Sequence, residues 1–148
     1  MITTKKQNIL EVEKGIIAHG CNCLGAMGGL AGSIATKWPI VKKDYVNLIK
    51  ESKHSWELLG TAQHVKINDD LSVFNLFSQY DVGNGRKTEY SAMHNALLDL
   101  NDQVNVEYEK TIYLPYLLGC GLGGGDWKIV YSMIDDVFQF NNVVICSL

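Results

Sequence analysis

The chain has 148 residues, of which 47% are hydrophobic and 20% charged, and its formal net charge at pH 7 is −3. This length predicts a single domain, residues 1–148, large enough to bury one core. The ordinary composition excludes a disordered or fibrous protein. The weakly acidic charge argues against a protein that grips duplex nucleic acid by its phosphates, although it is compatible with a small anionic ligand held by backbone dipoles.

Targeting and membrane segments are not expected. Lys5 and Lys6 stand near the start without the apolar stretch that follows such residues in a signal peptide. The longest apolar run, 112–118, is far shorter than the roughly 20 residues that cross a bilayer. Cys21 and Cys23 are too close in sequence for an ordinary disulfide. We therefore expect a cytoplasmic protein that binds no membrane and, without coiled-coil periodicity, a monomer.

In the first half of the chain, predicted strands precede two predicted helices and a hairpin. Residues 8–12 and 15–19 are short apolar segments typical of strands. Two helices follow, separated at Pro39 because proline disfavours helix just before itself. Their inward positions are Leu30, Ala31, Ile34 and Ala35 in the first, and Val41, Tyr45, Leu48 and Ile49 in the second. Segments 61–67 and 71–77 predict a hairpin around the turn residues 68–70.

The second half continues the alternation. Thr88 is predicted to cap a helix, and 111–118 is predicted to be a strand. Asp126 is predicted to cap an amphipathic helix, and a last short strand is expected at 142–146. The inward residues of these two helices are Tyr90, Met93, Leu97 and Leu100, and then Trp127, Val130, Ile134 and Val137. This order predicts an α/β domain with a mixed sheet between helix layers.

Ten of the 14 glycines fall into two clusters, one at 20–32 and the other at 119–125. Each cluster lies between a predicted strand and a predicted helix. At such a junction, free backbone N–H groups and the positive end of a helix dipole attract anions. Together the clusters predict a site for a diphosphate or another doubly anionic ligand. For either cluster alone, an ordinary tight turn is the alternative.

Other nucleotide and metal motifs fit less well. Residues 119–124 match G-x-G-x-x-G, but no acidic residue ends the next strand to hold a ribose, as a dinucleotide-binding unit requires. Neither cluster contains the Gly-Lys of a Walker A loop. A zinc site could be drawn from His19, Cys21, Cys23 and Cys120. The single residue between the first two cysteines is shorter than the spacing that structural zinc sites use. We therefore expect no metal and no cofactor.

Three segments, in order, resemble macro domains. Residues 18–35 (AHGCNCLGAMGGLAGSIA) resemble their first ligand loop, and 115–127 (PYLLGCGLGGGDW) resemble their phosphate loop and the start of the next helix. Between them, 75–79 (NLFSQ) and 85–90 (GRKTEY) resemble the middle segment of small stand-alone members. Those members are related to ADP-ribose-1″-phosphate phosphatases and to glycohydrolases that release terminal ADP-ribose. The resemblance covers nearly the whole chain and implies a three-layer α/β/α fold with a mixed sheet and a cleft for ADP-ribose.

The resemblance also implies which residues contact the ligand. Asn22 would hydrogen-bond the distal ribose, and the start of the following helix would approach that ribose and a phosphate. Asn8 stands where many macro domains carry an aspartate that reads the adenine amino group, and its amide oxygen can still accept a hydrogen bond. From the residues alone, Asn22 could instead be a turn residue and Asn8 a structural one. The remaining implied ligand-binding residues are Gly28, Gly29 and Leu30 in the first loop, and Gly121, Leu122, Gly123, Gly124 and Gly125 in the second.

Three side chains are candidates for catalysis. Lys87 falls where the terminal ADP-ribose glycohydrolases carry a lysine nucleophile, but Gly123 occupies the place of their aspartate. The nearest acid is Asp126, which could equally cap its helix. His19 resembles the histidine of the His-x-Cys-Asn pattern of phosphatase-like members, and a pKa near 6.5 would suit an acid or base. A buried, structural His19 is the alternative.

We expect an ADP-ribose-binding macro domain that hydrolyses ADP-ribose derivatives, ADP-ribose-1″-phosphate foremost. In that reaction His19 or Asp126 would assist attack on the terminal phosphate while the glycine loop stabilises the developing charge. One alternative is a hydrolase that removes ADP-ribose from modified proteins or nucleic acid, for which Lys87 would be required. The other is a non-catalytic module that binds ADP-ribose or a related nucleotide.

Overall fold

The computed structural model describes residues 1–83, 85–104, 109–121 and 123–148. Strands and helices alternate along most of it, as the sequence predicts. The strands are β1 (Ile2–Lys6), β2 (Gly15–Cys21), β3 (Ala62–Lys66), β4 (Leu71–Phe77), β5 (Ile112–Pro115) and β6 (Val143–Ser147). The helices are α1 (Gly29–Lys37), α2 (Pro39–Glu51), α3 (Tyr90–Val104) and α4 (Trp127–Val137), with short 3₁₀ helices η1 (Ile9–Glu11) and η2 (Ser55–Leu58).

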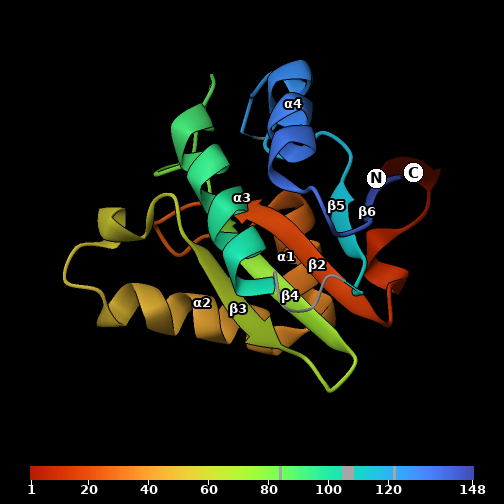
Figure 1. Cartoon of the computed structure of the whole chain (residues 1–148). Helices are drawn as coiled ribbons and strands as arrows, with labels where there is room; N and C mark the ends of the chain where they lie inside the picture. Colours follow the sequence, from red (N-terminus) through yellow and green to blue (C-terminus); the bar gives the residue numbers. More distant parts are fainter. Residues whose placement is uncertain (84, 105–108, 122) are drawn as a thin grey trace.

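The six strands form one mixed sheet in the order β1-β6-β5-β2-β4-β3. Neighbouring strands are parallel except for β3 and β4, which form the predicted antiparallel hairpin. Strand β2 is a central strand that lies between β5 and β4 (Figure 1). Its carboxyl end is therefore flanked by a neighbouring strand on each side. Ligands of open α/β sheets bind beyond the carboxyl ends of such parallel strands.

Helices cover both faces of the sheet. Figure 1 shows α3 and α4 over one face, while α1 and α2 lie on the other. On the first face, Met93 and Leu97 of α3 and Ile134 of α4 belong to one buried cluster with the sheet residues. On the second, Ile34 of α1 and Val41 of α2 belong to another. The three-layer α/β/α architecture predicted from the sequence is confirmed.

Local capping and turn residues explain several boundaries. The side-chain oxygen of Asn68 accepts hydrogen bonds from the N–H groups of Asp70 at 2.8 Å and Leu71 at 2.9 Å, which closes the hairpin turn. Asp126 caps α4, because its carboxylate accepts the N–H of Lys128 at 2.9 Å. Both features agree with the sequence predictions for these turns.

The strand prediction for 8–12 is wrong. The side-chain oxygen of Asn8 accepts the N–H of Leu10 at 3.0 Å and starts η1 instead. The first strand is β1, an edge strand with four of its five residues exposed, so it carries no alternation of apolar side chains that could mark it. The strand predicted at 111–118 is also shorter than expected, because the chain turns after Pro115.

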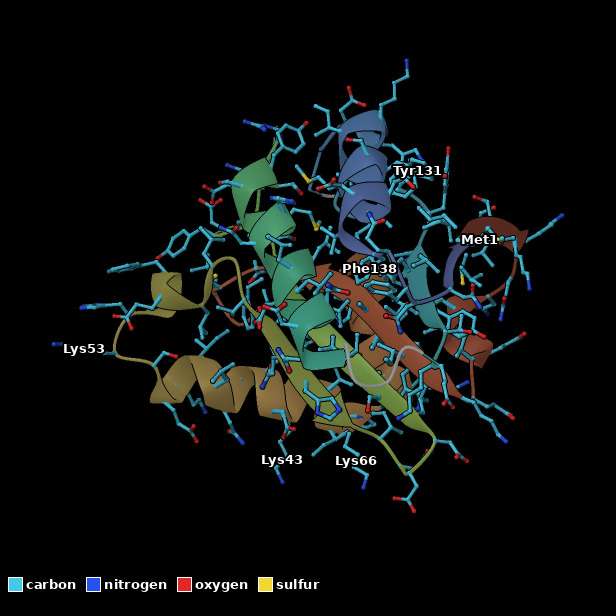
Figure 2. The ribbon with its side chains drawn as sticks, viewed as in Figure 1. Met1, Lys43, Lys53, Lys66, Tyr131 and Phe138 are labelled. Atoms are coloured by element: carbon cyan, nitrogen blue, oxygen red, sulfur yellow. The ribbon has the colours of Figure 1, made fainter. Side chains whose placement is uncertain are left out.

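Several labelled side chains show how the surface relates to the core. Lys43, Lys53 and Lys66 point outward from α2, the loop after it and β3, respectively (Figure 2). Lys66 pairs with Asp69 at 3.1 Å, and both side chains are exposed, so this pair contributes little to stability. Phe138, at the end of α4, is buried in the cluster under that helix. Within the described ranges, no helix is both long and apolar enough to cross a membrane.

Candidate functional site

A cleft of about 600 Å³ opens at the carboxyl ends of β2 and β5. Its volume lies in the range of roughly 300–1,000 Å³ typical of small-molecule sites. Both glycine-rich loops line it, together with the segment after β4, so segments far apart in sequence meet there. The lining residues are His19, Gly20, Cys21, Asn22, Ala26, Gly28, Leu30 and Ala31, then Gln79, Val82 and Gly83, then Pro115, Tyr116, Leu117, Leu118, Gly119, Gly121 and Gly123.

Asn22 shapes the first loop. Its side-chain oxygen accepts the N–H of Leu24 at 2.9 Å, and its side-chain nitrogen donates to the carbonyl of Ala26 at 2.7 Å. The buried hydroxyl of Tyr45, from α2, lies 2.7 Å from the same side-chain oxygen and accepts the N–H of Gly25 at 3.1 Å. Asn22 therefore lines the cleft and also performs the turn role that the residues alone left open.

The start of α1 faces the cleft without a side chain to cap it. Gly28 is the N-cap residue and has an extended backbone, and Gly29 follows with φ of 53°. A Cβ atom at Gly28 would meet nothing within 4 Å, so this position opens onto free space. Gly28 and Leu30 line the cleft, and Gly29 lies between them in the first turn. The N–H groups of a first helical turn have no partner within the helix, so they are suited to an anion.

The second loop offers fewer N–H groups than the sequence implies. Gly121 and Gly123 line the cleft. The N–H of Gly124 donates to the carbonyl of Gly121 at 3.1 Å, and the N–H of Gly125 donates to that of Gly119 at 2.9 Å. Tight turns therefore use these two N–H groups in the structure, and the contact of Gly124 and Gly125 with a diphosphate stays a prediction. Leu122, also predicted to bind the ligand, lies outside the described residues.

The second loop is clamped onto the segment before α3. The N–H groups of Lys87 and Thr88 both donate to the carbonyl of Gly123, at 2.7 and 2.9 Å. The Thr88 hydroxyl donates to the carbonyl of Gly119 at 2.6 Å, so it does not cap α3, which begins at Tyr90. A Cβ atom at Gly123 would lie 2.2 Å from the Thr88 hydroxyl oxygen. Glycine at 123 is therefore required by this neighbour.

Leu117, on the cleft wall, has an unusual backbone conformation. Among the described residues other than glycine, it is the one with a left-handed φ, of 64°. Two turns flank it, because Leu118 donates to the carbonyl of Pro115 at 3.1 Å and Cys120 donates to that of Leu117 at 2.7 Å. A left-handed conformation costs a residue with a Cβ atom roughly 1–2 kcal/mol, so the surrounding turns impose it.

His19 lines the cleft as a neutral side chain. It is 1% exposed, and its Nε2 lies 2.6 Å from the side-chain oxygen of Asn75. Burial removes water from the charged ring and lowers its pKa from 6.5 to about 4, while contacts with the Asn75 side chain and the Gly20 backbone oppose that shift. The pKa near neutrality expected from the sequence is therefore wrong. The other ring nitrogen, Nδ1, is buried and has no hydrogen-bond partner.

The structure does not bring the three candidate catalytic side chains together. Asp126 is absent from the cleft lining, and its carboxylate is occupied at the start of α4. The Nζ atom of Lys87 lies 3.7 Å from a carboxylate oxygen of Asp81 and would be 3.9 Å from a Cβ atom at Gly83. The end of the Lys87 side chain therefore lies beside the cleft-lining Gly83, although Lys87 is not itself among the lining residues. Asn8, the predicted adenine contact, caps η1 and is also not among the lining residues.

Several lining residues were not predicted, and Gln79 and Tyr116 are the ones with large polar or aromatic side chains. Gln79 donates to the carbonyl of Asp81 at 2.8 Å, and Tyr116 packs edge-on against Trp127 with ring centroids 5.4 Å apart. Both stand inside segments that resemble macro domains, but neither is marked by a spacing pattern. Their position on the cleft depends on how β4 and β5 are placed in the sheet, which the sequence does not show residue by residue.

The cysteines near the cleft are not activated nucleophiles. Cys21, Cys23 and Cys120 are free thiols, and the first two are buried. Burial raises the pKa of Cys23 to about 11 and that of Cys21 well above its usual value, so both stay protonated at neutral pH. Within the part of the chain that the structure describes, no group of three His, Cys, Asp or Glu residues could hold a metal ion.

Two relatives align with most of this chain. An uncharacterized 17.5 kDa protein of Enterobacteria phage T4 is 34% identical over 134 residues, which cover 87% of this chain and 83% of the phage protein. An ADP-ribose 1″-phosphate phosphatase of Saccharomyces cerevisiae is 32% identical over 105 residues, 68% of this chain, and the match spans 58% of the yeast protein. No protein-family model matches the chain.

Solved structures share the fold. A macrodomain protein from Streptomyces coelicolor is 25% identical, covers 100% of both chains and gives a TM-score of 0.79. A Thermosipho africanus DarTG in complex with ADP-ribose is 18% identical, with a TM-score of 0.80 over 99% of this chain and 42% of that one, which shows the fold alone. The mixed sheet, the two helix layers and the paired glycine loops on one cleft agree with these likenesses, and the chain belongs to the macro domain family.

Proposed function

We propose that this macro domain binds ADP-ribose or a derivative of it in the cleft between its two glycine loops. The observation that carries the proposal is that the first turn of α1 and the loop at Gly121 and Gly123 face the same 600 Å³ space. Backbone N–H groups at both sites suit a diphosphate, which is the centre of ADP-ribose. The name of the yeast relative and the ligand in the Thermosipho structure support this ligand class.

For the reaction, we propose hydrolysis of ADP-ribose derivatives, with ADP-ribose-1″-phosphate as the first candidate. The name of the yeast relative supports this choice. The N–H groups along the cleft would stabilise charge that develops on the phosphate. His19, the cleft-lining histidine, is neutral at pH 7 and can accept a hydrogen bond there, whereas Asp126 would act only through the start of α4. No cofactor or metal is part of the proposal.

A second candidate is removal of ADP-ribose from modified macromolecules. The observation that favours it is the place of Lys87, whose side chain lies beside the cleft residue Gly83 and is 28% exposed. Its partner Asp81 is 48% exposed, so the ion pair is weak and holds the lysine side chain only loosely. This activity would require Lys87 to reach the anomeric carbon as a nucleophile.

The first test is calorimetric titration with ADP-ribose, with AMP and NAD as controls. Gly28→Glu adds a negative charge at an open position on the cleft, and Ser33→Glu adds the same charge to the exposed side of the same helix. We expect micromolar binding to the natural chain and to Ser33→Glu, but none to Gly28→Glu. Absence of binding to the natural chain would overturn the proposed ligand.

Turnover assays then separate the candidate activities. We expect release of phosphate from ADP-ribose-1″-phosphate by the natural chain and by Lys87→Ala. Release of ADP-ribose from modified protein, lost in Lys87→Ala, would establish the second candidate instead. Tight binding without turnover of either substrate would identify a module that only binds its ligand.

We also propose that the protein is a cytoplasmic monomer folded as a single domain. The four free cysteines, three of them buried, suit a reducing compartment. Light scattering after gel filtration, performed with and without ADP-ribose, measures the oligomeric state. A mass twice the 16.5 kDa of one chain would refute the monomer.

A further inference from the structure

Three polar side chains form a row across the sheet, and the row begins at the cleft-lining His19. His19 of β2 lies opposite Asn75 of β4, and Asn75 lies opposite Gln63 of β3. Residues opposite one another on neighbouring strands project from the same face. The row ends on α2, because the side-chain nitrogen of Gln63 donates to the main-chain carbonyl of Asp44 at 3.0 Å. It therefore connects a helix on the outside of the sheet to the cleft.

Hydrogen-bond chemistry gives the row a single direction. The carbonyl of Asp44 can only accept, so Gln63 must present its NH₂ group to α2 and its oxygen to Asn75. Asn75 then donates from its NH₂ group to that oxygen at 3.1 Å and presents its own oxygen to His19. Because this oxygen can only accept, the ring nitrogen Nε2 of His19, at 2.6 Å, must carry the hydrogen. The main-chain carbonyl on α2 thus determines the tautomer of a histidine three side chains away.

In this tautomer Nδ1 of His19 carries a lone pair. The ring is neutral, so this nitrogen is an acceptor and not a donor. It is buried and has no partner in the structure, although His19 lines the cleft. Buried polar atoms without a partner are rare in native proteins, and one beside a ligand cleft indicates a missing donor.

We propose that Nδ1 of His19 accepts a hydrogen bond from a hydroxyl group of the bound ligand, and that Asn75 and Gln63 are positioning residues that keep this nitrogen in its acceptor form. The inference rests on the proposed function for the identity of the ligand, because the riboses of ADP-ribose carry hydroxyl groups. An ionised phosphate oxygen has no hydrogen to donate, whereas a ribose hydroxyl has one, and we therefore place a ribose of the ligand at His19. Since Nδ1 is covered in the unliganded chain, the cleft floor must open slightly to admit the hydroxyl.

The test is nitrogen NMR of protein labelled with ¹⁵N in its histidine rings. His19→Gln identifies the His19 signals by removing them, and the other histidines serve as internal references. In the free protein we expect a hydrogen on Nε2 and none on Nδ1. On saturation with ADP-ribose we expect the Nδ1 resonance to move in the direction of a hydrogen-bonded acceptor. An Nδ1 hydrogen in the free protein, or an Nδ1 resonance that does not move in the complex, would overturn the corresponding half of the proposal.

Variants of the half-buried Gln63 test the positioning role. Gln63→Met removes the group that orients Asn75, so we expect both tautomers of His19 and up to about a tenfold loss in ADP-ribose affinity, as expected for one lost hydrogen bond. Gln63→Glu keeps an oxygen toward Asn75 and should retain the natural tautomer. A single unchanged tautomer in Gln63→Met would refute the relay. If calorimetry shows no ADP-ribose binding at all, the proposed function and the ligand contact both fail, while the free-protein spectra still decide the relay.

Discussion

The burial of His19 should make the stability of this protein fall steeply in mild acid. The pKa of the ring is about 4 in the folded chain and 6.5 in an exposed reference. Between these pH values His19 is protonated in the unfolded chain but remains neutral in the folded chain. The stabilisation is therefore fully present above pH 6.5 and is lost as the pH falls through 6 and 5 towards 4.

The size of the effect follows from the shift. At about 1.4 kcal/mol for each pH unit, the full window is worth about 3 kcal/mol, of which about 2 kcal/mol is lost between pH 7 and 4.5. Carboxylates titrate in the same pH range, so measurements on the natural chain alone do not separate the contribution of His19 from theirs. His19→Gln carries the same carboxylates and lacks the imidazole, and the difference between the two proteins gives the contribution of His19.

The assay is urea unfolding of both proteins at several pH values between 4.5 and 7.5. We expect the natural chain to lose about 2 kcal/mol more than His19→Gln over this range. Equal losses would mean that His19 titrates normally in the folded protein. Such a result would contradict the desolvation of the ring that its burial implies.

Three further predictions concern the two loops and the start of α4. Tyr45→Phe removes a buried hydroxyl that holds Asn22, so we expect the free energy of unfolding to fall by about 1–3 kcal/mol and ADP-ribose to bind more weakly by calorimetry; unchanged affinity would show that the shape of the first loop does not matter. Asp126→Ala should cost about 1 kcal/mol through the lost cap while Asp126→Asn restores it, and phosphatase turnover should survive in both; loss of turnover in a stable Asp126→Asn would make the carboxylate catalytic. Gly123→Ala should lower the free energy of unfolding by about 1–3 kcal/mol in thermal or urea unfolding. Adding Thr88→Ala to this variant should restore only part of the loss, because the new Cβ would still lie 2.7 Å from the carbonyl of Gly119. Full restoration would contradict that second contact.

The sequence predicts the architecture because most elements have strong local signals. The spacing of apolar residues in α4 and the cap at Asp126 are local, and so is the turn at Asn68. The 8–12 segment fails because Asn8 captures the N–H of Leu10, a competition that apolar content does not reveal. The edge strand Ile2–Lys6 is held by pairing to β6 and not by an apolar face. Its sequence therefore lacks the alternation of apolar and polar residues that predicts a strand.

The candidate site is predictable only in outline. The two glycine clusters show where the loops are, but the reason for each glycine depends on distant neighbours. The Thr88 hydroxyl leaves no room for a side chain at Gly123, whereas a side chain at Gly28 would extend into free space. The neutral state of His19 depends on burial and on Asn75, which lies 56 positions further along the chain. Propensity and spacing carry no information about such long-range contacts.

The strained backbone at Leu117 has a consequence for the thermodynamics of binding. The φ of 64° is intrinsically unfavourable for leucine, so Leu117 would adopt another conformation if it were unconstrained. The two flanking turns keep it in this conformation in the folded protein. The conformational entropy of that cleft wall is therefore lost before any ligand arrives. A ligand that contacts Leu117 meets a preorganised surface and does not have to order the wall during association, which leaves more of the contact energy available as affinity.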